Sequence, residues 1–339
     1  MRRGLTFCAL GLGVLATFAA PLPAAANGFP PAAVYTTTVT TAPSLGTVVS
    51  AASGDTVFTI DPSTGIVTRT SGSGVRVSTS TTRAAVSIRC GNESACNTTY
   101  VVVKVGPLGS PTKRARALTN FTVAMNTAVE AAPTEGANPL LLGLDPIPQN
   151  ATRTFYIGFD YGIAGDSSGL ASGAASSGFY VYVTGYPNTN PTTGTTSSAA
   201  ATVYRPITLS NPTGLVFGSV VRPASGSGTV VINDSTGART LTGGVVALST
   251  PTPSKAAYTV TGEGGQSFSL SIPTSFAMTT TGGSVTVTLT STATGSQTLS
   301  SSIGSAGTFG FSIGGSLPVA STTKDGAYTG TFTVSVQYN

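Results

Sequence analysis

The sequence contains no histidine and no tryptophan, and only 8% of its 339 residues are Asp, Glu, Lys or Arg. Without histidine it has no Ser-His-Asp or Cys-His arrangement and no histidine-ligated zinc site. The eleven acidic residues form no D-x-D or E-x-x-E pair, and no G-x-x-x-x-G-K-[ST] loop occurs. We therefore expect no enzyme, no cofactor and no metal site. A carbohydrate-active enzyme with two distant carboxylates is the catalytic alternative.

Two groups of acidic residues allow a second interpretation. Asp160 and Asp166 lie six residues apart in "DYGIAGDSSG", which is either a calcium loop or a plain loop. Asp61 and Asp234 lie in "DPSTG" and "NDSTG", where Asp or Asn followed by Gly is typical of a hairpin turn rather than of a ligand. We expect a plain loop at Asp160 and Asp166, and hairpin turns at Asp61 and Asp234.

Charge is also too sparse to indicate a nucleic-acid partner. The chain has a formal net charge of +5, part of which comes from Arg2 and Arg3 at its start. A short basic group, Lys113, Arg114 and Arg116, is predicted to lie in a solvated loop. Because no basic patch or stripe is evident, we expect no binding to nucleic acid.

The first 26 residues are typical of a secretory signal peptide. Arg2 and Arg3 precede an apolar stretch, Leu5 to Ala20, and Ala24-Ala25-Ala26 offers a cleavage site. The apolar stretch is short for a membrane anchor, and Pro21 and Pro23 interrupt it. The sequence predicts a secreted protein.

Two cysteines, Cys90 and Cys96, remain after the signal peptide, in "RCGNESACN". In a secreted chain two neighbouring cysteines most simply form one disulfide, and two free thiols are the alternative. The bridge would close a small hairpin or loop and add modest stability.

The composition favours strands joined by tight turns, with 42 glycines, 21 prolines and many β-branched residues. The chain also aligns with itself: residues 45–72 match residues 217–244 without gaps, at thirteen identical positions. Further matched blocks follow, including 84–90 over 256–262, 155–163 over 309–317, and 179–183 over 332–336. Each block alternates apolar with polar residues, as half-buried strands do.

The repeat predicts an all-β protein with two tandem immunoglobulin-like antiparallel β-sandwiches. The expected organisation is a signal peptide over 1–26, copy one over 27–186, a polar linker over 187–201, and copy two over 202–339. The segment 199–210 could be the first strand of copy two or could complete copy one. Copy one has two enlarged loops, around Cys90 and over 127–150, which are either functional or tolerated insertions.

The last fourteen residues, "GAYTGTFTVSVQYN", form a strongly patterned strand. Large apolar residues or glycine occupy every second position from Tyr328 to Tyr338. In copy one the matching strand continues into further chain. We expect the strand of copy two to lack a neighbour, and an open edge of this kind needs a cover. Strand donation by another subunit would provide it.

This ending resembles that of subunits exported by the bacterial chaperone–usher pathway. The resemblance rests on a glycine fourteenth from the end, alternating apolar residues and a penultimate aromatic, and the predicted assembly strand comprises Gly326, Tyr328, Phe332, Val334, Val336, Tyr338 and Asn339. It implies that a periplasmic chaperone pairs with this strand and holds the carboxylate of Asn339. It also implies an outer-membrane usher and other fimbrial subunits as partners.

Copy two, over 205–339, also resembles a secreted bacterial family known as a domain of unknown function, on stretches such as "PITLSNPTGLVFGSV" and "ARTLTGGV". Copy two has no cysteine, and the start after the signal peptide offers only Val34, Tyr35 and Val39 as apolar donor residues. A two-domain subunit with a poor donor of its own resembles a tip adhesin.

Two functions remain open at this point. The first is a two-domain pilin or tip adhesin for cell adhesion. It would pass through the periplasm to the cell surface or fimbrium, and would bind a surface ligand. The second is a self-contained secreted binding or matrix protein with two closed sandwiches. Copy two of such a protein would be stable without a chaperone or an added strand.

Overall fold

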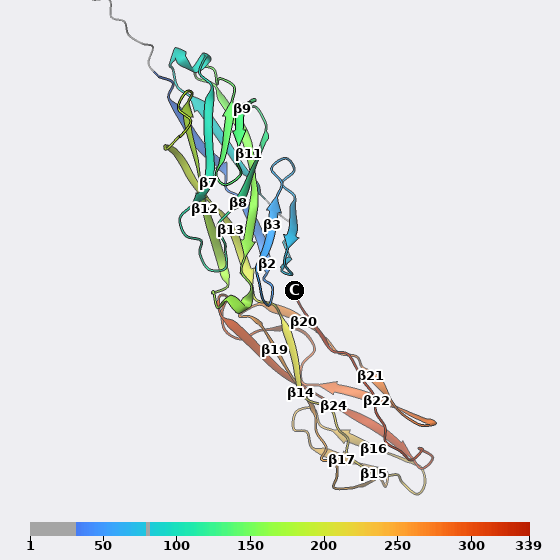
Figure 1. Ribbon diagram of the computed structural model, residues 1–339. Coiled ribbons are helices and arrows are strands. Elements are labelled where there is room, and N and C mark those ends of the chain that lie inside the picture. Colours follow the sequence, from blue (N-terminus) through green and yellow to red (C-terminus); the bar gives the residue numbers. More distant parts are fainter. Residues whose placement is uncertain (1–31, 79–81) are drawn as a thin grey trace, which may run out of the picture.

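The computed structural model describes residues 32–78 and 82–339, so the predicted signal peptide lies outside the described residues. Within this range the chain is all-β, apart from two short 3-10 helices, η1 (Ser94–Asn97) and η2 (Asp166–Ser168). It forms an elongated molecule of two parts placed end to end (Figure 1). We call residues 32–204 the first half and residues 205–339 the second half. Among the described residues no helix is long and apolar enough to cross a membrane.

The first half consists of two sheets that share one hydrophobic core. The core takes Phe155 and Phe159 from one sheet and Phe179 and Val181 from the other, all fully buried. The strands, in sheet order, are β1 (Tyr35–Thr41), β6 (Ala84–Cys90), β11 (Thr152–Ile163), β3 (Thr56–Ile60) and β4 (Val67–Ser71), with β8 (Thr119–Met125) also on β11; and β5 (Val75–Arg76), β2 (Ser44–Val49), β13 (Gly194–Tyr204), β12 (Gly173–Gly185), β7 (Val101–Leu108), β10 (Leu140–Leu144) and β9 (Glu130–Glu135).

The second half has one large sheet and two small ones. Its strands, in sheet order, are β14 (Thr208–Thr213), β19 (Ala256–Glu263), β24 (Ala306–Ala320), β16 (Ser227–Ile232) and β17 (Arg239–Leu241), with β22 (Gly283–Ser291) on β24 and β21 (Ser275–Thr280) on β22; then β15 (Val220–Val221) with β18 (Val246–Ala247); and β23 (Gly295–Thr298), β20 (Ser267–Ser271) and β25 (Ser335–Tyr338). Its apolar side chains form two smaller core clusters instead of one.

The large sheets of the two halves have the same strand order. β1-β6-β11-β3-β4 with β8 corresponds to β14-β19-β24-β16-β17 with β22. The pairing corrects one matched block: Phe155 lies opposite Val86, whereas Phe311, not Phe309, lies opposite the corresponding Tyr258. The expected alignment of 155–163 with 309–317 is therefore displaced by two residues.

The two expected turns are built alike. Asp61 Oδ1 accepts hydrogen bonds from the main-chain N–H groups of Ser63 (2.8 Å) and Thr64 (2.9 Å). At the corresponding place Asn233 Oδ1, not Asp234, accepts from the N–H groups two and three residues on, at 2.9 and 2.8 Å. The Ser63 hydroxyl, which also donates to Asp61 Oδ1 at 2.6 Å, and the main-chain N–H of Thr64 lower the pKa of Asp61 to about 2. Side chains that satisfy their own turn in this way act as turn formers.

The expected linker over 187–201 is corrected by the position of β13. Its residues 194–203 pair antiparallel with β12 and, over Ala200–Tyr204, parallel with β2. Of the segment 199–210, residues 199–204 therefore complete the sheet of the first half, whereas residues 208–210 begin β14, the first strand of the second half, so the segment serves both of the places open to it. Tyr35 and Val39 belong to β1, which pairs with β6, so they are engaged in the first half.

Candidate functional site

The second half has a gap where β13 lies in the first half. β13 stands between β2 and β12 and joins them into one seven-stranded sheet. The counterparts of β2 and β12 are β15 and β25, which belong to two separate sheets. Among residues 32–78 and 82–339 no strand bridges them. These described residues of the second half thus contain no counterpart of β13.

The last segment of the second half has neighbours on one side only. β25 pairs with β20, and Thr279 and Thr329 form an isolated bridge further along. The same contact occurs in the first half, where Thr112 N–H donates to the carbonyl of Ser176. Within the described range, residues 331–334 belong to no strand pair at all. By contrast, β12 pairs with β13 over Gly173–Tyr182 and with β7 over Gly178–Gly185.

The gap forms an open groove of about 630 Å³. Its walls come from the segment before and including β15, from β24, from the β21–β22 hairpin and from residues 323–330; the apolar lining residues are Leu215, Phe217, Val220, Met278, Val285, Leu317, Val319 and Tyr328. An unpaired strand edge beside an apolar groove is the arrangement into which an extended segment can add as a further strand.

Burial of equivalent residues shows what the missing strand would cover. Val48, Phe179 and Val181 of the first half are fully buried. Their counterparts Val220, Phe332 and Val334 are only partly buried. In the first half each of these positions is paired directly with β13, which shields its side of the core from solvent. The second half therefore leaves apolar area exposed that a further strand would remove from water.

The predicted assembly residues lie along this groove and its continuation. Phe332, Val334, Val336 and Tyr338 pack against the core from its open side, and the Phe332 ring lies 5.0 Å from that of Phe276. Gly326 has φ +148, and a Cβ there would lie 2.5 Å from Thr280 Oγ1, which explains a glycine at this position. Asn339 donates its main-chain N–H to Ser267 and its side-chain amide to Ser296.

Tyr338 reaches the junction between the two halves. Its hydroxyl donates to the carbonyl of Arg205 (2.9 Å) and accepts from the N–H of Glu263 (2.6 Å). Its ring lies 5.9 Å from that of Tyr204, the last residue of β13. Burial raises the pKa of Tyr338 to about 12. The last segment of the second half is thus anchored beside the end of the strand that closes the first half.

A charged network holds the same junction. Asp166 accepts from Arg114 and, at 2.7 Å, from Arg205. The fully buried Glu263 accepts from the N–H groups of Arg205 (3.0 Å) and Gly304 (2.5 Å). The solvated loop expected around Arg114 is wrong: this side chain is fully buried and also donates to Ser50 Oγ at 2.6 Å.

The possible calcium loop does not form from Asp160 and Asp166. Asp160 accepts from Thr59 Oγ1 (2.5 Å) and from Asn120 Nδ2 (2.6 Å), whereas Asp166 belongs to the junction network. No group of three or more metal-ligating side chains occurs in the part of the chain that the structure describes.

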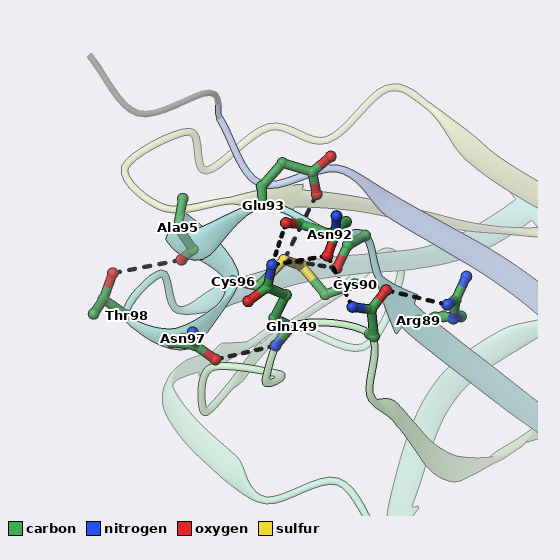
Figure 2. The surroundings of a disulfide bond; sticks show 11 residues. Arg89, Cys90, Asn92, Glu93, Ala95, Cys96, Asn97, Thr98 and Gln149 are labelled. Atoms are coloured by element: carbon green, nitrogen blue, oxygen red, sulfur yellow. Dashed lines mark hydrogen bonds between the residues drawn. A yellow bond between two sulfur atoms is a disulfide. The ribbon is translucent and has the colours of Figure 1, made fainter. Parts of the chain in front are cut away.

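The expected loop over 127–150 is corrected, because most of it forms the β9–β10 hairpin, which extends the sheet beyond β7. Its last residues meet the enlarged loop around Cys90 at the far end of the first half, away from the second half (Figures 1 and 2). Cys90 and Cys96 form the predicted disulfide. Gln149, from the second loop, donates its main-chain N–H to Asn97 Oδ1 (3.0 Å) and its side-chain amide to Asn92 Oδ1 (2.9 Å). Asn150 donates to the same Asn92 oxygen at 3.0 Å. The loops therefore form one amide-rich surface.

Comparison with known proteins gives a partial family match. A family described as a domain of unknown function, DUF4402, matches residues 207–338, which is less than half of the chain. This agrees with the resemblance expected for copy two. No curated protein matches the chain.

Among solved structures, the chain is similar to the CsuC–CsuE chaperone–tip adhesion subunit complex of archaic chaperone–usher Csu pili from Acinetobacter baumannii (10% identity, TM-score 0.25, 89% of this chain and 99% of that chain). It is also similar to a chaperone–tip adhesin complex of CFA/I fimbriae biogenesis (11%, 0.24, 89% and 98%). A third is CfaE, the adhesive subunit of CFA/I fimbria of enterotoxigenic Escherichia coli (10%, 0.24, 88% and 93%).

Proposed function

We propose that the protein is a secreted, non-enzymatic fimbrial subunit whose second half is completed by a strand from another protein. In this proposal the two halves are copies of one immunoglobulin-like β-sandwich. A periplasmic chaperone supplies the missing strand in transit, an outer-membrane usher follows, and a neighbouring subunit supplies the strand in the fibre. The amide-rich far end of the first half is the surface offered to a ligand, as in a tip adhesin.

One observation supports this proposal above the others. The first half contains β13 between β2 and β12, and the second half has an apolar groove at the same place. In a monomer an apolar groove beside an unpaired strand edge promotes aggregation. A strand from a partner would pair with the edge and cover the groove. The alternative, a self-contained protein with two closed sandwiches, leaves this groove without an explanation.

The test compares two neighbouring residues of β15. Val220 lines the groove, whereas Val221 points away from it and is 49% exposed. Val220→Lys places a charge where the donated strand would lie, and the matched control Val221→Lys places the same charge on the outer face. We expect Val220→Lys to lose capture by a co-expressed periplasmic chaperone and surface display, and Val221→Lys to retain both.

Thermal unfolding of both purified variants shows whether they remain folded. Capture and display of a folded Val220→Lys variant at the wild-type level would overturn the proposal. Deletion of residues 329–338 provides a second test, because it removes the strand with which the donor would pair. Display that survives this deletion would also contradict strand donation.

A further inference from the structure

The groove differs from its closed counterpart at one pair of equivalent residues, Tyr161 and Leu317. Tyr161 of β11 lies opposite Phe58 of β3, and Leu317 of β24 lies opposite Val230 of β16. Phe58 and Val230 occupy the same position in the ungapped alignment of 45–72 with 217–244. The two residues therefore occupy the same place behind the site of the closing strand.

In the first half this place is filled from the sheet and not from the closing strand. Tyr161 is fully buried, and its hydroxyl donates to the carbonyl of Ala199 in β13 at 3.1 Å. Ala199 is itself fully buried and contributes only a methyl group to the core. Because protein interiors are close-packed, a large tyrosine and a small alanine share a fixed volume here.

In the second half the sheet places a smaller side chain, Leu317, at this position. Leu317 has no ring and no hydroxyl with which to reach a closing strand, and it is only partly buried in the groove wall. A strand that offers only a methyl group opposite Leu317 would leave empty the space that the Tyr161 ring fills in the first half, and unfilled volume is unfavourable.

Two larger residues of the second half do not compensate. Phe217 is the counterpart of Leu45, but its side chain is only 5% exposed and is thus already packed in the core. Tyr328 stands where the first half has Ala175, but its hydroxyl turns to the carbonyl of Lys324 at 2.9 Å. The groove retains its volume with both residues in its wall.

We infer that the second half selects a strand with a large aliphatic or aromatic residue at the position that Ala199 has in β13. This inference rests on the proposed function, since it names which strand the groove accepts. By the pattern of β13, that strand runs parallel to residues 216–221 and antiparallel to residues 326–338. The β13 sequence of a second copy is a poor fit, so copies of this chain do not close one another.

The experiment is a cycle of two peptides and two proteins. One fluorescently labelled peptide has the sequence of residues 194–204, and the other has the same sequence with Ala199→Leu. Each is titrated against the full chain without residues 1–26, as wild type and as Leu317→Tyr, by fluorescence anisotropy. We expect the leucine peptide to bind the wild type about tenfold more tightly or better, since it buries three more carbon atoms. Leu317→Tyr should abolish or reverse this preference.

Leu317→Phe, which adds bulk without a hydroxyl, is a second variant should Leu317→Tyr fold poorly, and it should also weaken the preference. Equal binding of both peptides, or tighter binding of the unchanged peptide, would overturn the size inference and leave strand acceptance intact. Binding of neither peptide to the wild-type protein would overturn strand acceptance and the inference together.

Discussion

The hydroxyl of Tyr338 lies 2.9 Å from the carbonyl oxygen of Arg205, the residue that directly follows β13. This hydrogen bond connects the last strand of the second half with the closing strand of the first. Asp166 accepts a hydrogen bond from the Arg205 guanidinium, and Glu263 accepts one from the Arg205 main-chain N–H. Residues 326–338 therefore begin at the wall of the open groove and end at the junction between the halves.

Tyr338→Phe removes both hydrogen bonds of this hydroxyl and leaves the N–H of Glu263 without its partner. We expect the free energy of unfolding of the second half to fall by about 1–3 kcal/mol, as for an unsatisfied buried donor. Urea denaturation measures the change. Tyr328→Phe is the matched control, because its hydroxyl bonds only an exposed carbonyl; an equal loss in both variants would contradict the role of Tyr338.

The same residue predicts a loss of stability at alkaline pH. Burial raises the pKa of Tyr338 from 10 to about 12, so the unfolded chain releases this proton first. Its contribution to stability is complete below about pH 10 and is lost as the pH rises toward 12. Burial also raises the pKa of Tyr161, so this residue contributes to the same loss of stability at alkaline pH. We expect a shallower alkaline decline for Tyr338→Phe than for the wild type; identical pH profiles would be inconsistent with this pKa.

Arg114 tests the buried side of the junction. Arg114→Ala removes the ion pair with Asp166 and leaves Ser50 Oγ and the carbonyl of Leu170 without their partner. Each buried polar group left without a partner typically costs about 1–3 kcal/mol, while Asp166, which is 34% exposed, keeps its ion pair with Arg205. An exposed pair contributes about 0–1 kcal/mol. Arg116→Ala, which breaks the exposed pair with Asp55, is the control. We expect urea denaturation to show a clearly larger loss of unfolding free energy for Arg114→Ala than for Arg116→Ala. Similar small losses in both variants would contradict the role given to the burial of Arg114.

The disulfide joins residues six apart, so it closes a short loop. The double variant Cys90→Ala/Cys96→Ala should lose about 2 kcal/mol by the chain-entropy estimate for so short a ring. We also expect faster hydrogen exchange at the Gln149 N–H, because Asn97 holds it from the same loop. Unchanged exchange at Gln149 would show that the two enlarged loops are ordered independently.

Local chemistry explains which features the sequence predicted. Alternation at period two identified most strands, and Asp61 and Asn233 form the expected turns because their bonds reach only two or three residues along the chain. The burial of Arg114 depends on Asp166, 52 residues away, so no local pattern indicates it. The register of 155–163 could not be read from the alternation, because a displacement of two residues leaves a period-two pattern unchanged.

The closing strand β13 was the hardest element to place. Ala199, Ala201 and Val203 alternate with outward residues, but alanine and threonine give a weak period-two signal. The preference of the groove for a large residue depends on Tyr161 and Leu317, whose equivalence appears only once the strands are paired. The alternation predicted one strand over the last fourteen residues, but only Ser335–Tyr338 form β25 and Thr329 forms an isolated bridge. The groove beside them required the structure.

Native-state hydrogen exchange of the full chain without residues 1–26 tests the open second half most directly. Residues 178–181 of β12 are paired on two edges, and residues 331–334 of the corresponding segment are not paired. We predict fast exchange over 331–334 and slow exchange over 178–181 in the free protein, and slowing over 331–334 when the leucine peptide binds. Equally slow exchange in both segments of the free protein would contradict the account.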